Sequence, residues 1–192
     1  MPSISVICPT IGRASVVTLI EAIIPQLSLE DEFILVGDGP QPAAKLAAEM
    51  VPRVRYLETL VRVGDFGCTP CDFAIERAKG DFVMFIGDDD LPTTQALEFV
   101  REGVAMDLSF PHIFSMMHTG NVLSGSSGCG QVSGQQLVVP RDMNKMPKMA
   151  DCPQESWLVS DWIFIDKVIR AWGGVMFHEE IIAVLDRQRY GQ

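Results

Sequence analysis

Strand-like and helix-like segments alternate through the first half of this 192-residue chain. Each β-rich run is followed by a turn signal and then by a segment with helical spacing of its apolar residues. The β-rich runs span 3–8, 32–37, 54–58 and 80–87, and the helical segments span 14–27, 43–50, 69–78 and 94–104. Such alternation predicts a parallel sheet covered by helices. Because the runs are continuously apolar, we expect the sheet to be buried on both faces.

The second half of the chain is less regular. Residues 112–117, 175–178 and 181–185 are β-rich, and 160–172 has the spacing of an amphipathic helix. The segment 120–136 is rich in glycine and serine and lacks periodicity. Connections of that kind are often lids, so we predict an irregular, mobile lid there.

Composition excludes several classes of protein. A net charge of −10 argues against a nonspecific grip on nucleic acid or on an anionic membrane. No apolar run approaches the roughly 18 to 20 residues of a membrane-spanning helix. The first residues lack a basic leader, and five cysteines is an odd number, which suits a reducing compartment. We therefore expect one cytoplasmic domain.

The motif Cys68-Thr-Pro-Cys71 stands at a predicted helix start. A redox or zinc role for this motif is one interpretation. The three histidines lie far from it in sequence and there is no second C-x-x-C. Two small side chains that pack a helix entry are the interpretation we favour.

An acidic cluster, Asp88-Asp89-Asp90, follows directly on the apolar run 80–87. Like charges this close raise one another's pKa unless a cation lies among them. Mg²⁺ and Mn²⁺ prefer oxygen ligands, and Mg²⁺ commonly combines one or two carboxylates with substrate phosphates. Ligands of open α/β sheets bind beyond the carboxyl ends of the strands. The cluster thus predicts a site for a metal-bound phosphate ester, with a solvated acidic turn as the alternative.

Four segments together resemble the inverting family 2 glycosyltransferases of the GT-A fold. They are Ile4-Ser-Val-Ile-Cys-Pro-Thr-Ile-Gly-Arg13, Val36-Gly-Asp-Gly39, the stretch from Ala74 to Asp90, and Ser160-Asp161-Trp162. The resemblance implies an α/β, Rossmann-like three-layer sandwich with a mainly parallel central sheet in a single domain. It also implies a nucleotide-sugar-binding half, 1–105, and an acceptor-binding half, 106–192, of that same domain.

Two departures from the family pattern concern the candidate site. The first carboxylate of the family's D-x-D motif falls on Gly87, so that Asp89 inherits a metal ligand and Asp88 or Asp90 must replace the missing one. A register shifted by one makes Asp88 and Asp90 the pair. The family's Arg-Asn before the third helix appears here as Cys71-Asp72.

The resemblance implies a general base and a divalent metal, Mn²⁺ or Mg²⁺. Asp161 corresponds to the base; its alternative role is the N-cap of the following helix, with Ser160 as the rival cap. Asp89 and Asp90 are the expected metal ligands. His178 is a further candidate ligand, although a lone histidine at a strand end is more often structural.

The donor implied by the resemblance is a UDP- or GDP-sugar. Its expected contacts are Pro9, Thr10, Arg13, Asp38, Gly39, Asp72 and Asp88. Asp38 has the alternative of a plain turn residue, and Arg13 that of a solvated loop residue. Arg187 and Arg189 are candidates to close on the diphosphate, and Trp157 and Trp162 to stack on an acceptor sugar.

Two rival functions remain open. A nucleotidyltransferase has a related sheet and an acidic metal site, but Pro9-Thr-Ile-Gly-Arg13 is poor in glycine for its phosphate loop. A non-catalytic sugar-nucleotide-binding module is the other, suggested by Gly87 and Cys71. The acceptor hydroxyl is open among small molecules, glycans, lipids, proteins and modified nucleobases.

Overall fold

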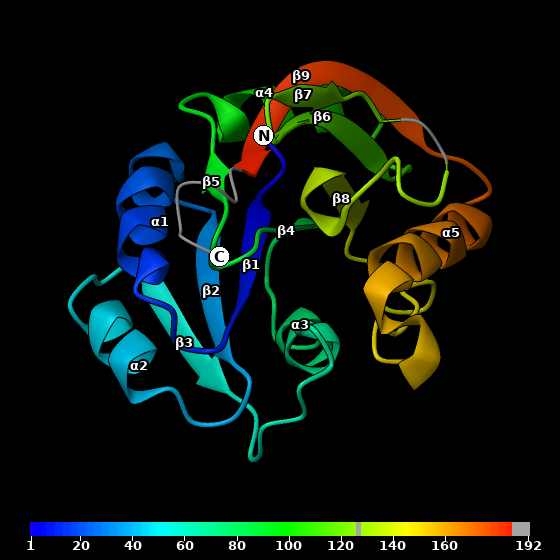
Figure 1. Cartoon of the computed structure of the whole chain (residues 1–192). Coiled ribbons are helices and arrows are strands. Elements are labelled where there is room, and N and C mark those ends of the chain that lie inside the picture. The colour runs from blue at the N-terminus through cyan, green and yellow to red at the C-terminus, as the bar shows by residue number, and fades with distance from the viewer. Residues whose placement is uncertain (126–127, 186–192) are drawn as a thin grey trace.

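The computed structural model describes residues 1–125 and 128–185, and within them nine strands form one curled sheet (Figure 1). The strands of the first half are β1 (Ile4–Thr10), β2 (Glu32–Gly37), β3 (Val54–Glu58) and β4 (Phe82–Phe85). They lie in the order β3-β2-β1-β4, and every neighbouring pair is parallel. The predicted parallel unit is confirmed.

The rest of the sheet is mixed. It consists of β5 (Leu91–Pro92), β6 (His112–His118), β7 (Asn121–Leu123), β8 (Leu137–Pro140) and β9 (Met176–Leu185). β8 pairs antiparallel with both β4 and β6, whereas β9 runs parallel to β6. β5 pairs antiparallel with the end of β9, where Leu91 lies opposite Val184. The end of β9 is therefore beside the residues that follow the acidic cluster.

Helices cover both faces of the sheet (Figure 1). One face carries α1 (Ser15–Ile23), α2 (Pro42–Glu49) and α4 (Ala96–Met106), and the other carries α3 (Cys68–Ile75) and α5 (Ser160–Trp172). Short 3₁₀ turns complete the chain as η1 (Ile24–Gln26), η2 (Gly134–Gln136) and η3 (Gln154–Val159). Successive β1 residues, Val6 and Ile7, belong to opposite cores and are both fully buried. This two-sided burial explains why β1, β2 and β4 are apolar at most successive positions.

The prediction of an irregular segment over 120–136 is wrong at both ends. β7 pairs with β6, with Leu123 opposite Met116, and η2 begins at Gly134. The fully buried Gln136 side chain donates hydrogen bonds to the carbonyls of Phe114 and Leu123, which ties the segment to the sheet. Directly after this segment comes β8, which joins the two halves of the sheet. The sequence pattern did not indicate this strand.

Two smaller expectations also change. The β-rich runs 175–178 and 181–185 form one strand, β9, because its pairing with β6 continues across a bulge. None of the helices in the described part of the chain is long and apolar enough to cross a membrane.

Candidate active site

Asp88 joins the loop after β4 to the loop after β1. Its carboxylate is buried, and Oδ2 accepts hydrogen bonds from Thr10 Oγ1 at 2.7 Å and from the Ile11 N–H at 3.2 Å. Its Oδ1 pairs with the Arg13 guanidinium. The structure thus brings together Thr10, Arg13 and Asp88, all expected from the sequence, and it uses Asp88 as the acceptor that holds the two loops.

Asp89 and Asp90 differ from Asp88 in the acceptor capacity that they keep. Asp89 is partly exposed, and its Oδ2 lies 3.6 Å from Arg13 Nη1. Asp90 is buried, and its Oδ2 accepts from Gln135 Nε2 at 2.6 Å and from the Gly87 N–H at 3.2 Å. Its Oδ1 is buried without a hydrogen-bond partner among the described residues. Burial, together with the charges of its acidic neighbours, raises the pKa of Asp90 to about 6.

Gly87, where the first carboxylate of the D-x-D motif would fall, has no room for a side chain. A Cβ on Gly87 would lie 2.6 Å from Asp90 Oδ2 and 3.0 Å from Asp89 Oδ1. The Asp90 carboxylate therefore occupies the space into which a side chain at residue 87 would project. Of the alternatives left open by the sequence, this geometry favours Asp89 with Asp90, because both oxygens of Asp88 already have partners.

The pair Asp89 and Asp90 fits a divalent metal that a phosphate completes. A buried carboxylate oxygen without a partner costs free energy until a donor or a cation meets it. Mg²⁺ is commonly held by one or two carboxylates together with substrate phosphates. Within residues 1–125 and 128–185, no three His, Cys, Asp or Glu side chains are grouped to hold a metal ion. Two carboxylates would leave further coordination positions of such a metal to oxygen atoms of a ligand.

Asp161 lies in the first turn of α5, on the opposite side of the site. Its Oδ2 accepts from the Gly134 N–H at 2.9 Å and from Ser133 Oγ at 3.0 Å. The N-cap residue of α5 is Val159, and no side chain caps the helix there. The capping alternative is therefore wrong, because Asp161 binds the η2 turn instead.

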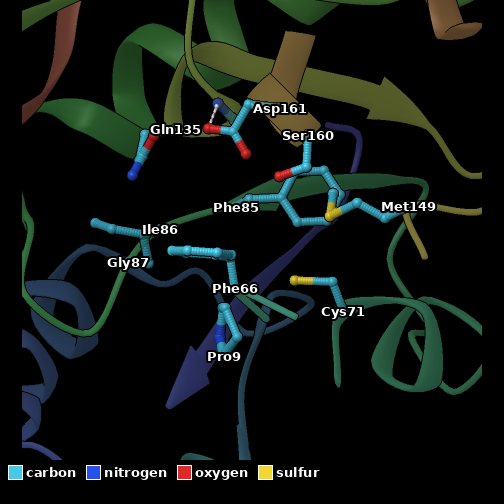
Figure 2. A pocket seen from close by; sticks show the side chains of 11 residues that line it. Pro9, Phe66, Cys71, Phe85, Ile86, Gly87, Gln135, Met149, Ser160 and Asp161 are labelled. Atoms are coloured by element: carbon cyan, nitrogen blue, oxygen red, sulfur yellow. Dashed lines mark hydrogen bonds between the residues drawn. The ribbon is translucent and has the colours of Figure 1, made fainter. Parts of the chain in front are cut away.

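A cavity of about 310 Å³ lies between Asp161 and the loops after β1 and β4 (Figure 2). Asp161 and Gln135 are on one side of it, and Pro9 and Phe66 are on the other (Figure 2). The cavity is lined by Pro9, Phe66, Cys71, Phe85, Ile86, Gly87, Gly134, Gln135, Met149, Ser160 and Asp161. Residues as far apart in the chain as Pro9 and Asp161 thus meet at the carboxyl ends of the parallel strands, as the sheet pattern predicts.

Asp38 and Gly39 shape the loop that follows β3. The two Asp38 oxygens accept from the N–H groups of Val63 at 2.7 Å and Gly64 at 2.9 Å. Gly39 has a φ of +70°, and a Cβ there would lie 2.7 Å from the backbone nitrogen of Arg62. Both residues therefore hold the 59–64 loop in place, and a direct donor contact from Asp38 would have to share these acceptor oxygens.

Asp72 has a comparable role on α3. Its carboxylate accepts from the N–H groups of Met149 at 2.8 Å and Ala150 at 2.9 Å. Burial raises the pKa of Asp72, and the two backbone hydrogen bonds oppose that shift. Because Met149 lines the cavity, Asp72 positions a cavity wall, which is an indirect role and not the expected donor contact.

His178 lies away from the acidic cluster. Its Nε2 is 2.8 Å from Nδ1 of the buried His112, and its ring stacks on Phe114 with centroids 4.4 Å apart. The His112 ring is 6.0 Å from that of Phe82, the first residue of β4, whereas the acidic cluster follows the end of β4. The prediction that His178 binds the metal is therefore wrong. The β6–β9 pairing places this histidine near the start of β4, whereas the acidic cluster follows the end of β4.

The C-x-x-C motif lies on the first turn of α3 with both thiols buried. Burial raises the pKa of Cys68 to about 12 and that of Cys71 well above its ordinary value. Thiols with raised pKa values stay protonated and are poor nucleophiles and metal ligands. The packing interpretation is the one that this environment favours.

Phe66 and Gln135 contribute to the site without having been expected from the sequence. Phe66 lines the cavity with a left-handed backbone, φ 58°, and is 68% exposed. A bulky residue at positive φ is uncommon and marks a strained position. Gln135 lies in the glycine- and serine-rich segment, where nothing in the pattern distinguishes it. Only its contact with Asp90 does so.

Three of the expected side chains cannot be compared with the cavity. Arg187, Arg189 and the side chain of Trp157 lie outside the part of the chain that the structure describes. The Trp162 side chain packs, partly buried, against the core beneath α5 and does not line the cavity.

Comparison with known proteins identifies the fold. No protein-family profile and no curated protein sequence matches this chain. Among solved structures, S. aureus TarS 1–349 matches with a TM-score of 0.74 at 16% identity, over 95% of this chain and 60% of that one. TarS 1–349 in complex with UDP-GlcNAc gives 0.74 at 15% identity, over 95% and 58%. The mannosyltransferase PcManGT from Pyrobaculum calidifontis, in complex with GDP-Man and Mn²⁺, gives 0.75 at 16% identity, over 99% and 58%.

The chain thus spans about 60% of the length of these neighbours. At such low identity the likeness concerns the fold. The predicted fold class, an α/β domain with a GT-A-like fold, is confirmed by these matches.

Proposed function

We propose that this chain is a glycosyltransferase that transfers a sugar from a nucleotide-diphosphate donor to an acceptor hydroxyl with inversion. The observation that carries the proposal is the position of Asp161, which lies across the cavity from the loop that bears Asp89 and Asp90. An inverting transfer needs a base on the acceptor side of the anomeric carbon and charge neutralisation on the leaving-group side. The donors held by the structural neighbours, UDP-GlcNAc in TarS and GDP-Man in PcManGT, support this choice.

Asp161 is the proposed general base. The acceptor oxygen attacks the anomeric carbon, the bond from that carbon to the diphosphate breaks, and the acceptor proton passes to Asp161. Two hydrogen bonds to Oδ2 hold the carboxylate in place before the substrate arrives. Such preorganisation lowers the entropic cost of bringing base and acceptor together.

Residues 1–105 form the proposed donor half, and the rest of the chain forms the acceptor half. Asp89 and Asp90 would hold Mn²⁺ or Mg²⁺, which when bound would neutralise charge on the departing diphosphate. Arg13, 3.6 Å from Asp89, adds a positive charge beside the same loop. Pro9 forms part of the cavity wall, and Asp38 and Gly39 shape the neighbouring loop. A family 2, hexosyltransferase-type enzyme in the cytoplasm is the finer form of the proposal.

Release of nucleoside diphosphate tests this function directly. The protein is incubated with UDP- and GDP-sugars and Mn²⁺, and the products are separated by ion-exchange chromatography. We expect UDP or GDP to be released slowly to water and faster once an acceptor is found. Release of pyrophosphate would indicate a nucleotidyltransferase, and binding without turnover would indicate a non-catalytic module.

A further inference from the structure

A continuous chain of polar contacts joins the two sides of the cavity. Gln135 Nε2 donates to Asp90 Oδ2 at 2.6 Å, and Gln135 Oε1 meets the Ser133 hydroxyl. The same hydroxyl lies 3.0 Å from Asp161 Oδ2. The path from Asp90 to Asp161 thus passes through the side chains of Gln135 and Ser133.

The backbone of the η2 turn reinforces this connection. The Gly134 N–H donates to Asp161 at 2.9 Å, and Gly134 stands between Ser133 and Gln135 in the chain. The turn is itself anchored, because the Ser133 N–H donates to the side chain of Gln136, which is fully buried. A short anchored turn transmits a displacement at one end to the other, since it has few internal degrees of freedom.

The Ser133 hydroxyl has one proton and faces two acceptors, Gln135 Oε1 and Asp161 Oδ2. A hydroxyl donates one hydrogen bond at a time. Any shift of Gln135 therefore changes how Ser133 is shared between Gln135 and Asp161. Networks of this kind polarise along their length, so that an event at one end is felt at the other.

Resting on the proposed function, we propose that Gln135 and Ser133 are positioning residues that couple the metal and diphosphate at Asp90 to the proposed base, Asp161. Gln135 would hold the Asp90 carboxylate so that Oδ1, which has no hydrogen-bond partner among the described residues, is available to a metal. Engagement of Asp90 then fixes Gln135, and through Ser133 it fixes the orientation of Asp161. The Asp161 carboxylate is thereby oriented for proton transfer when the donor is bound, and it is less restrained when the donor is absent.

The coupling is tested by calorimetry of UDP and GDP binding in the presence of Mn²⁺. Gln135→Met keeps the volume of the side chain and removes its donor, and we expect Mn²⁺-dependent affinity to fall by roughly 10- to 100-fold, the usual scale for a partner of a metal ligand. Gln95→Met, at an exposed position bonded to Glu98, is the matched control and should bind like the parent. A thermal melt of each variant identifies any loss of fold.

A double-mutant cycle separates coupling from a merely structural role. Asp161→Ala removes the acceptor for Ser133 and Gly134, and it should weaken Mn²⁺-dependent nucleotide affinity by about fivefold, the lower end of typical coupling between sites. Asp161→Asn retains an acceptor oxygen and should preserve that affinity. In the Gln135→Met background, Asp161→Ala should have no further effect.

Ser133→Ala interrupts the same path and leaves both carboxylates intact. In the Ser133→Ala background, Asp161→Ala should therefore cause a smaller loss of Mn²⁺-dependent nucleotide affinity than it does in the parent. Parental affinity in Asp161→Ala, or an equal loss in both backgrounds, would overturn the coupling. A parent protein that binds neither nucleotide with Mn²⁺ would instead overturn the proposed function, and the coupling with it.

Discussion

The two halves of the molecule use their carboxylates differently. In the first half, Asp38, Asp72 and Asp88 accept hydrogen bonds that hold loops against one another. In the second half, Asp161 accepts hydrogen bonds from the short η2 turn and lines the cavity. Asp90 belongs to the first half by sequence, but its position depends on Gln135 from the second. Both oxygens of Asp38 and of Asp88 have partners, whereas Asp90 Oδ1 has no hydrogen-bond partner among the described residues.

The largest expected effect concerns Asp161, the carboxylate of the second half that we propose to be catalytic. Asp161→Asn keeps the size of the side chain and an acceptor for the η2 turn, so the melting temperature should stay close to that of the parent. Turnover should fall by roughly 10² to 10⁴, the usual contribution of a positioned general base. Steady-state release of UDP or GDP measures it, with Asp166→Asn as the control. Parental turnover in Asp161→Asn would end the base assignment.

Removal of the metal pair should have the next largest effect. Asp89→Ala or addition of EDTA should lower the affinity for UDP or GDP measured with Mn²⁺ by roughly 10- to 100-fold. Stability should change little in Asp89→Ala, because the substitution also removes like-charge repulsion. Glu98→Gln, on the exposed face of α4, should bind as the parent does. Equal nucleotide affinity with Mn²⁺ and with EDTA would contradict a metal bridge.

Asp38 tests the structural side of the comparison. Asp38→Ala leaves the N–H groups of Val63 and Gly64 without their acceptor. The free energy of unfolding should fall by about 1.5 to 3 kcal/mol, the usual net contribution of hydrogen bonds to a charged acceptor, because Asp38 is buried although Val63 and Gly64 are exposed. Urea denaturation measures this loss. If Asp38→Ala instead kept parental stability and lost nucleotide affinity, the residue would be a donor contact and not a loop anchor.

The smallest effect is expected from the histidine pair outside the site. Burial lowers the pKa of His112 and of His178. The unfolded chain, with histidine pKa values of about 6.5, therefore binds protons more readily than the folded protein. The neutral histidine pair therefore contributes its full share of the free energy of unfolding above about pH 6.5, and this share declines as the pH falls below that value.

Melting temperatures between about pH 7 and about pH 5 measure this decline, around the ordinary histidine pKa. His112→Gln should reduce the decline, whereas His118→Gln, outside the pair, should retain it. Asp90 acts in the opposite direction, since its pKa of about 6 is raised and favours the folded state as the pH falls. The same decline in His112→Gln as in the parent would show that the pair does not control it.

Much of the fold follows from sequence patterns that act locally. The apolar runs that became β1, β2 and β4 are buried on both faces, which favours apolar residues at successive positions, whereas the edge strand β3 is only partly buried. The alternation with helices requires parallel pairing. The carboxyl ends of β1 and β4 consequently meet, and this brings Thr10 and Asp88 to 2.7 Å of one another.

Other features depended on contacts that no local pattern specifies. β8 has only four residues and is recognisable as a strand only by its partners β4 and β6. The bulge in the β6–β9 pairing and the register of β9 place His178 beside His112, far along β4 from the acidic cluster.

By itself, the sequence determined the parallel half of the sheet, the location of the acidic cluster at its edge and the candidacy of Asp161. Only the tertiary structure decided which carboxylate oxygens already accept hydrogen bonds and which could still bind a ligand. Asp88 and Asp90 are both buried acidic residues of one short cluster. Both oxygens of Asp88 have partners, in Thr10, Ile11 and Arg13, while Asp90 Oδ1 has no hydrogen-bond partner among the described residues. Hydrogen-bond satisfaction is set by donors that arrive from distant parts of the chain, and a local sequence pattern carries no record of them.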